Sequence, residues 1–198
     1  MTIKARCKNL CRRLRTDADK GSAAVEFAMI APIFFVLLMG TMEAGIIFFA
    51  QSTLQNAVND TARLVRTGQT ACYTKDAGNN CVPMTAADFQ TQLCSEVSVL
   101  LQGCTTGSLQ FDVNAYPAGF KNASNASPLD PTNKTLPTLN AFNVGNACDV
   151  VLVRAFYKWP VLVPGLDYFL VNMADNNHLL ATAAAFRNEP FNNNAAGC

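Results

Sequence analysis

Residues 20–40 read KGSAAVEFAMIAPIFFVLLMG, an apolar run that begins directly after a basic segment and contains one carboxylate, Glu26. A carboxylate at the centre of a membrane helix costs roughly 2.5–3.5 kcal/mol on insertion scales. Glu26 lies near the basic end of the run, where this cost is smaller, but the residue still needs a partner. Cleavage after Gly21 would create one, because Ser22 would then carry a charged α-amine four residues before the glutamate.

The apolar segment is long enough to cross a lipid bilayer. Residues 23–50 are almost all apolar or small apart from Glu26 and Glu43, and about 20 apolar residues span a hydrocarbon core of about 30 Å. A secretory signal peptide is the alternative, but its apolar run is about 7–15 residues long and ends in an Ala-x-Ala-like site. Residues 48–51 do not provide such a site. We therefore expect a retained membrane helix over residues 22–50, bent at Pro32, which lacks a backbone donor.

Charge is distributed unevenly along the chain, although its formal net charge is only +1. Residues 1–21 hold seven Lys or Arg side chains and two Asp, whereas the rest of the chain holds eight basic and twelve acidic side chains. A basic block before an apolar span keeps the N-terminus in the cytoplasm. The leader, residues 1–21, fits either a basic amphipathic helix on the inner leaflet or a disordered tail. Nucleic-acid binding is not expected, because few basic residues remain for a folded face.

The helix is expected to continue beyond the membrane span as an amphipathic extension over residues 51–68. Apolar and small residues recur there at the i, i+3, i+4, i+7 spacing of one helix face, and Gly68 is a suitable end. These residues are Leu54, Ala57, Val58, Thr61, Ala62 and Val65.

Residues 69–198 read as a separate head. Thr85 and Asp88 form a capping box for a short helix that closes near Gly103. Three further segments have strand character, namely 109–115, 149–157 and 179–187.

Two other parts of the head read as loops. Residues 117–147 are rich in Asn, Pro, Ser and Thr and predict a long surface loop. Residues 159–166 predict an apolar loop or short helix that rests on the membrane edge. The sum is an α+β fold in which a long N-terminal helix lies against a small antiparallel sheet.

The cysteines favour disulfides in an oxidising compartment. Cys7 and Cys11 lie in the leader, and six others lie beyond the membrane span. A metal site is the alternative, but eight and nine intervening residues are not zinc spacings. We favour the two short loops and join the remaining cysteines by elimination. The resulting pairs are Cys72–Cys81, Cys94–Cys104 and Cys148–Cys198.

The sequence contains no recognisable catalytic, cofactor or metal motif. His178 is the single histidine, and there is no Gly-x-Ser-x-Gly sequence, P-loop or dinucleotide fingerprint. We therefore expect no enzyme activity, no cofactor and no bound metal. A membrane-tethered enzyme is the least favoured class.

The run Gly21-Ser22-Ala23-Ala24-Val25-Glu26-Phe27-Ala28, followed by Pro32, resembles the start of TadE-like proteins, minor pilins of the tight-adherence (Flp) branch of type IV pili. Residues 150–160 and 186–191 also resemble the C-terminal half of that family. The resemblance implies cleavage between Gly21 and Ser22 by a prepilin peptidase of the bacterial inner membrane. It further implies a periplasmic head, and assembly with other pilins and pseudopilins on an inner-membrane platform. Phe27 occupies the position where major pilins of this branch usually carry Tyr, which favours a minor pilin.

The residues themselves suggest how such subunits would associate. Glu26 of one chain can pair with the Ser22 α-amine of its neighbour, which offsets the penalty of burying each charge in lipid. Small residues at Ala24 and Ala28 let helices approach closely. Two alternatives remain. Glu26 can instead extend toward the cytoplasmic interface, and the chain can be an uncleaved, signal-anchored envelope protein whose head is a binding module.

Overall fold

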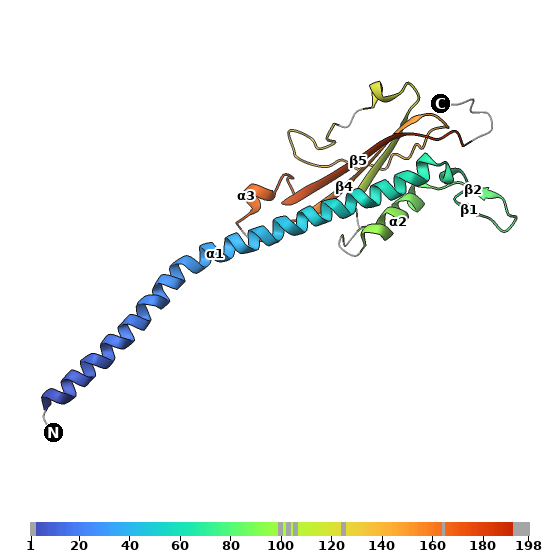
Figure 1. Ribbon diagram of the computed structural model, residues 1–198. Helices are drawn as coiled ribbons and strands as arrows, with labels where there is room; N and C mark the ends of the chain where they lie inside the picture. Colours follow the sequence, from blue (N-terminus) through green and yellow to red (C-terminus); the bar gives the residue numbers. More distant parts are fainter. Residues whose placement is uncertain are drawn as a thin grey trace. The chain divides into compact units, whose positions relative to one another are not determined.

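The computed structural model describes residues 3–98, 101, 104, 107–123, 126–163 and 165–191, with side chains from residue 21 onward except residue 122. The chain divides into two compact units, Met1–Ala44 and Gly45–Cys198. Each unit is described by itself below, with element labels as in Figure 1.

The helix α1 (Ile3–Arg66) supplies the described part of the first unit and continues into the second. Within the described residues it is the one helix long and apolar enough to cross a membrane, over Gly21–Arg66. The helix continues through Pro32. Proline removes one backbone hydrogen-bond donor at this position, but the helix does not end there. The bend expected at Pro32 stays a prediction.

In the second unit, α1 buries one face against the head. Ala50, Leu54, Ala57, Val58, Ala62 and Val65 are all buried and belong to the main core cluster. These residues recur three and four positions apart, which places them on one side of the helix. The amphipathic pattern expected over residues 51–68 is therefore present as a packed helix face.

The helix ends at a glycine in the left-handed conformation. Gly68 has φ 73°, and its N–H donates to the carbonyl oxygen of Val65 at 3.1 Å. A Cβ atom at this position would overlap the ring of Phe191. Two requirements therefore select glycine here, a positive φ and a close approach from the C-terminal segment.

The head contains a three-stranded antiparallel sheet with the strand order β3-β4-β5. The strands are β3 (Leu109–Tyr116), β4 (Val150–Pro160) and β5 (Asn177–Arg187). Leu109 pairs with Tyr157 in one ladder, and Val150 pairs with Arg187 in the other. The expected α+β arrangement of a long apolar helix and a small antiparallel sheet is confirmed.

The central strand β4 is buried on both faces. Val151, Val153 and Ala155 join the core cluster that includes α1, whereas Phe156 belongs to a second cluster on the other face. Leu136 and Met173 are buried in that second cluster. This explains the nearly continuous apolar sequence of β4, since a strand covered on both sides needs no polar alternation.

The segment expected as a surface loop, residues 117–147, thus contributes to the core. It also lies along the outer side of β3, where the N–H of Val113 donates to the carbonyl oxygen of Ala141 at 2.8 Å. The N–H of Asn143 donates in turn to the carbonyl oxygen of Val113 at 2.8 Å. The described part of the segment is mostly irregular and exposed or half-buried, but apolar residues within it, such as Leu136, cover a face of the sheet.

A short helix, α2 (Ala86–Val97), completes the main core. Thr85 and Asp88 form the capping box expected from the sequence, and Phe89 packs against Phe111 with ring centroids 5.2 Å apart. The expected helix end at Gly103 lies outside the described residues.

Two described disulfides bound short segments beside these elements. Cys72 is joined to Cys81 around the hairpin of β1 (Thr74–Lys75) and β2 (Cys81–Val82), which pair antiparallel. Cys94 on α2 is joined to Cys104. Both are the pairings expected from the short loops. Cys148 is also disulfide-bonded, and its expected partner, Cys198, lies outside the described residues.

The strand boundaries differ from expectation at one end of β4. Trp159 and Pro160, expected in an apolar loop, are the last residues of β4, where they pair with His178 and Asn177. Pro160 is tolerated there because the end of a strand requires fewer ladder hydrogen bonds. The short helix α3 (Asp167–Leu170) follows in the connection to β5.

Replacement of Gly68 by alanine should destabilise the head more than the same change at Gly107. Both glycines have a positive φ, 73° and 85°, but only at Gly68 would a Cβ atom meet another described residue. Overpacking of this kind typically costs about 1–3 kcal/mol beyond backbone strain. Urea unfolding of the two variants in detergent, followed by circular dichroism, measures the difference. Equal unfolding midpoints for Gly68→Ala and Gly107→Ala would contradict the packing role of Phe191.

Removal of the capping hydroxyl should raise the pKa of Asp88. Hydrogen bonds from the Thr85 side chain and backbone hold the pKa of this carboxyl below its usual value. The ionised carboxylate therefore stabilises the folded state at pH values above its usual pKa, and this stabilisation is lost as pH falls through the lowered pKa. In Thr85→Ala, an NMR titration should show the pKa of Asp88 moving up. Asp76, whose pKa is lowered mainly by Asn80, serves as the internal control and should not move.

Candidate assembly site on the apolar helix

Glu26 lies on the exposed surface of α1, one helical turn after Ser22. The hydroxyl of Ser22 donates a hydrogen bond to Glu26 Oε1 at 3.2 Å. A carboxylate offers about four acceptor positions, and a neutral hydroxyl does not balance its charge. The helix therefore presents a carboxylate that still has capacity for a cationic partner.

The expected processing site, Gly21 and Ser22, is exposed and helical. A Cβ atom at Gly21 would meet nothing within 4 Å among the described residues, and the glycine has no positive φ. Glycine in a helix interior is about 0.8–1 kcal/mol less favourable than alanine. Neither the packing nor the backbone described for this chain requires glycine at position 21.

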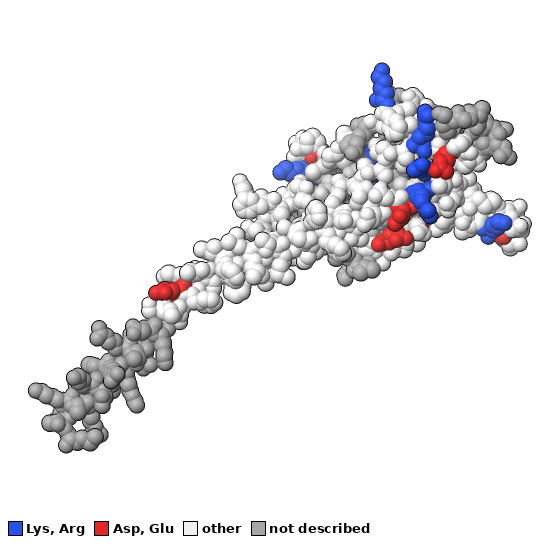
Figure 2. Space-filling model, viewed as in Figure 1, with Lys and Arg blue, Asp and Glu red and all other residues white. Residues whose placement is uncertain are grey.

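Large apolar side chains are exposed all around residues 21–44 of α1. Figure 2 shows this part of the helix as an uncharged surface apart from one acidic spot, whereas charged side chains gather over the head. A helix that is apolar on every side is stable only inside a membrane or among other apolar helices. The exposed residues are Val25, Phe27, Met29, Ile30, Ile33, Phe34, Phe35, Val36, Leu37, Leu38, Met39 and Met42.

The other carboxylate of the apolar helix is in a different situation. Glu43 is only 4% exposed, and it is engaged in an interaction. Of the two glutamates in the apolar segment, Glu26 alone is presented on the helix surface. Phe27, the residue after it, is also exposed.

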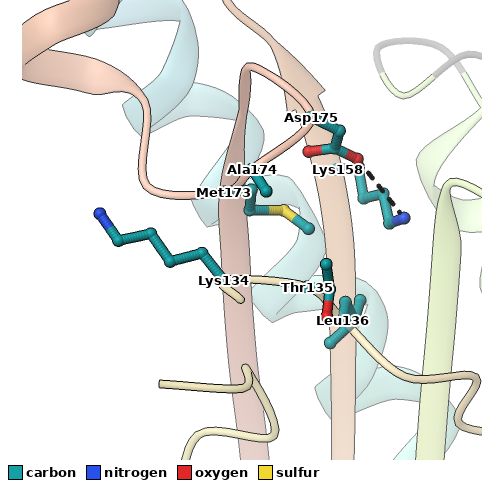
Figure 3. A pocket seen from close by; sticks show the side chains of 7 residues that line it. All are labelled: Lys134, Thr135, Leu136, Lys158, Met173, Ala174 and Asp175. Carbon is teal, nitrogen blue, oxygen red and sulfur yellow. Dashed lines mark ion pairs between the residues drawn. The ribbon is translucent and has the colours of Figure 1, made fainter. Parts of the chain in front are cut away.

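The head has a pocket of about 380 Å³ between the end of β4 and the loops that cover the sheet (Figure 3). Its lining includes Lys134, Lys158 and Asp175, and Lys158 Nζ lies 3.6 Å from Asp175 Oδ2. The remaining lining residues are Thr135, Leu136, Met173 and Ala174. This lining provides a single ion pair and no nucleophile beside a base. Groups of three potential metal ligands are likewise absent from the described residues.

A buried ion pair in the sheet was missed by sequence reasoning. Asp112 on β3 is 4% exposed and accepts from the guanidinium of Arg154 on β4 and from the side-chain amide of Asn114. A second guanidinium nitrogen of Arg154 donates to the carbonyl oxygen of Ala126 at 2.9 Å. In the sequence, Asp112 alternates with Phe111 and Val113, a period-2 pattern typical of a residue on the solvent side of a half-buried strand. The signal available was the single arginine within the otherwise apolar stretch of β4.

This ion pair has a structural role. The hydrogen bond from Arg154 to Ala126 joins the sheet to the covering segment, and Arg154 Cζ also lies 5.7 Å from the ring centroid of Phe156 on the same strand. Burial of Asp112 requires such a partner, since an unpaired buried charge is strongly unfavourable. The arrangement stabilises the outer layer of the head and offers no open binding position.

Comparison with known proteins identifies the helix rather than the head. Residues 21–63 match the family model described as TadE, TadE-like protein. No curated protein and no solved structure matches the chain. The matched range starts at the expected processing glycine and includes Ser22, Glu26, Phe27 and Pro32. The chain therefore carries a TadE-like domain at residues 21–63.

Proposed function

We propose that the chain is a minor pilin or pseudopilin of a Tad (Flp-type) adhesive pilus, cut between Gly21 and Ser22 and assembled through α1. The observation that carries this proposal is the exposed carboxylate of Glu26 on a helix that is apolar on every side. Only a lipid bilayer or neighbouring apolar helices can cover such a surface. A membrane anchor alone has no need of a carboxylate there, whereas a subunit that gains an amine by cleavage does.

The environment of Gly21 supports processing at this peptide bond. Glycine is unfavourable in a helix, and the described structure gives no packing reason for it. A protease that must fit the substrate backbone closely provides that reason, because glycine lets another backbone approach. The peptidase in this proposal is the prepilin peptidase of the bacterial inner membrane. The head lies on the periplasmic side in this proposal.

The hydrogen bond between Ser22 and Glu26 fits the proposed assembly step. In one chain the serine hydroxyl occupies one acceptor position of the carboxylate. After cleavage the α-amine of a neighbouring chain can occupy another position and supply the balancing charge. Charge-assisted hydrogen bonds are roughly twice as strong as neutral ones, so this pairing would set the axial offset between adjacent helices.

Processing predicts a mature chain that begins at Ser22. Mass spectrometry of protein from cells that contain a prepilin peptidase should show loss of residues 1–21. Gly21→Val should block the cut, because the added side chain obstructs close backbone approach. Gly45→Val is the matched control, since Gly45 also has no described neighbour within 4 Å of an added Cβ, and this variant should be cut normally. An uncut wild-type chain in pilus-forming cells would favour the alternative of an uncleaved envelope protein with a binding head.

Removal of the carboxylate should affect assembly rather than insertion. Glu26→Ala is expected to enter the membrane and be cut, but its amount in sheared pilus fractions should fall at least about tenfold. A loss of about 1.4 kcal/mol of association free energy between subunits corresponds to that factor. Glu26→Gln should behave similarly, because it retains the shape but not the charge. Immunoblots of membrane and pilus fractions measure the ratio.

Ser22→Ala separates the two partners of Glu26. This variant loses the hydroxyl seen in the structure but keeps the α-amine produced by cleavage. It should therefore assemble nearly as well as the wild type. A defect as large as that of Glu26→Ala would show that the hydroxyl, and not the amine, is the important partner.

A further inference from the structure

The connection between β4 and β5 exposes aromatic side chains at one end of the head. Tyr168 and Phe169 in α3 are 90% and 77% exposed, and their rings contact each other edge to face with centroids 5.3 Å apart. Residues 161–172 contain no Lys or Arg and one acidic residue, Asp167. Exposed aromatic groups of this kind mark a surface that another phase or molecule covers.

The contacts of β5 show which end of the head this is. The side-chain amide of Gln51 donates to the carbonyl oxygen of Ala181 at 2.7 Å, and farther along Arg66 Nε lies 3.3 Å from Glu189 Oε1. β5 and the segment after it therefore run in the same direction as α1. The start of β5, and the connection before it, lie beside the part of α1 where that helix enters the head (Figure 1).

The same level of α1 has its own exposed apolar residues. Ile46, Phe48 and Phe49 are exposed, and Gln51 is the first strongly polar residue after them. These residues are the C-terminal end of the apolar run that is long enough to cross a bilayer. The exposed aromatic pair of α3 is thus at the height along the helix where the apolar run ends.

The connection is held in place by hydrogen bonds rather than by core packing. His178 Nδ1 is hydrogen-bonded to the carbonyl oxygen of Leu170, and the N–H of Leu179 donates to Asn172 Oδ1 at 2.7 Å. α3 buries none of its four residues. Hydrogen bonds therefore order a segment whose aromatic rings are exposed and not part of the protein core.

We propose that residues 165–172 form a second membrane contact, with Tyr168 and Phe169 inserted into the interfacial layer of the leaflet where α1 leaves the bilayer. Tyrosine suits this layer, because its ring enters the apolar region while its hydroxyl stays hydrated. A lipid surface fits better than a protein groove, because the patch continues the exposed apolar end of the membrane helix.

This inference goes beyond the proposed pilin function and requires only that the apolar segment is in a bilayer. The test uses the full chain in nanodiscs that hold one copy each and contain lipids brominated either near the headgroup or deep in the acyl chain. Tyr168→Trp places a fluorophore on the patch. Trp159 is buried, and emission from the wild-type chain is subtracted as background.

Two matched variants frame the result. Phe34→Trp lies within the apolar run and reports insertion of α1. Phe120→Trp is 57% exposed and follows β3 at the end of the sheet where Val150 pairs with Arg187, far from α3 along the sheet. Tyr168→Trp should lose emission with shallow bromines more than with deep ones, and Phe120→Trp should lose none with either.

Other outcomes overturn the inference. Quenching of Phe34→Trp without quenching of Tyr168→Trp would show an inserted helix whose head does not touch the bilayer, and the proposed pilin function would be unaffected. Equal quenching of Tyr168→Trp and Phe120→Trp would show a head lying on the membrane without a specific contact. Protection of Tyr168→Trp from acrylamide only in discs with two copies would assign the patch to another copy of this chain.

Discussion

The structure depends on one helix that must be covered in two different ways. From Val25 to Phe49 large apolar side chains are exposed on every side of α1, with Glu26 among them, and from Ala50 onward its buried residues lie on one face against the sheet. An α-helix can pass between these surroundings because its backbone hydrogen bonds are internal. The change in side-chain pattern near Gln51 therefore separates a membrane-type surface from a protein-type surface without a break in the helix.

Local patterns made much of this fold predictable. Three elements follow from residues that are close together in the sequence. They are the helix after Gln51, the helix capped by Thr85 and Asp88, and the alternating strand β3. The short disulfide loops belong to the same category, because their cysteines are close in sequence. The structure differs from expectation where partners are far apart in sequence.

The covering of β4 is the clearest example of such a distant partnership. Nothing near Phe156 indicates that Leu136 and Met173 will bury it, and nothing near Asp112 identifies Arg154 as its partner. The candidate assembly site is a different case. Glu26 is recognisable from its charge within an apolar run, and Gly21 and Ser22 from their position before it and from the resemblance to TadE-like proteins. Their proposed partner is another chain, which no single-chain pattern describes.

The parallel course of β5 and α1 also has a mechanical meaning. Gln51 holds Ala181 near one end of this pair, and Arg66 holds Glu189 near the other. A tensile load applied to the head along the axis of α1 would be shared by both attachments at once, in shear, instead of opening them one after the other. Gly68 and Phe191 lie just beyond the second attachment. The packing of Phe191 against Gly68 therefore opposes separation of the helix from the sheet at this end.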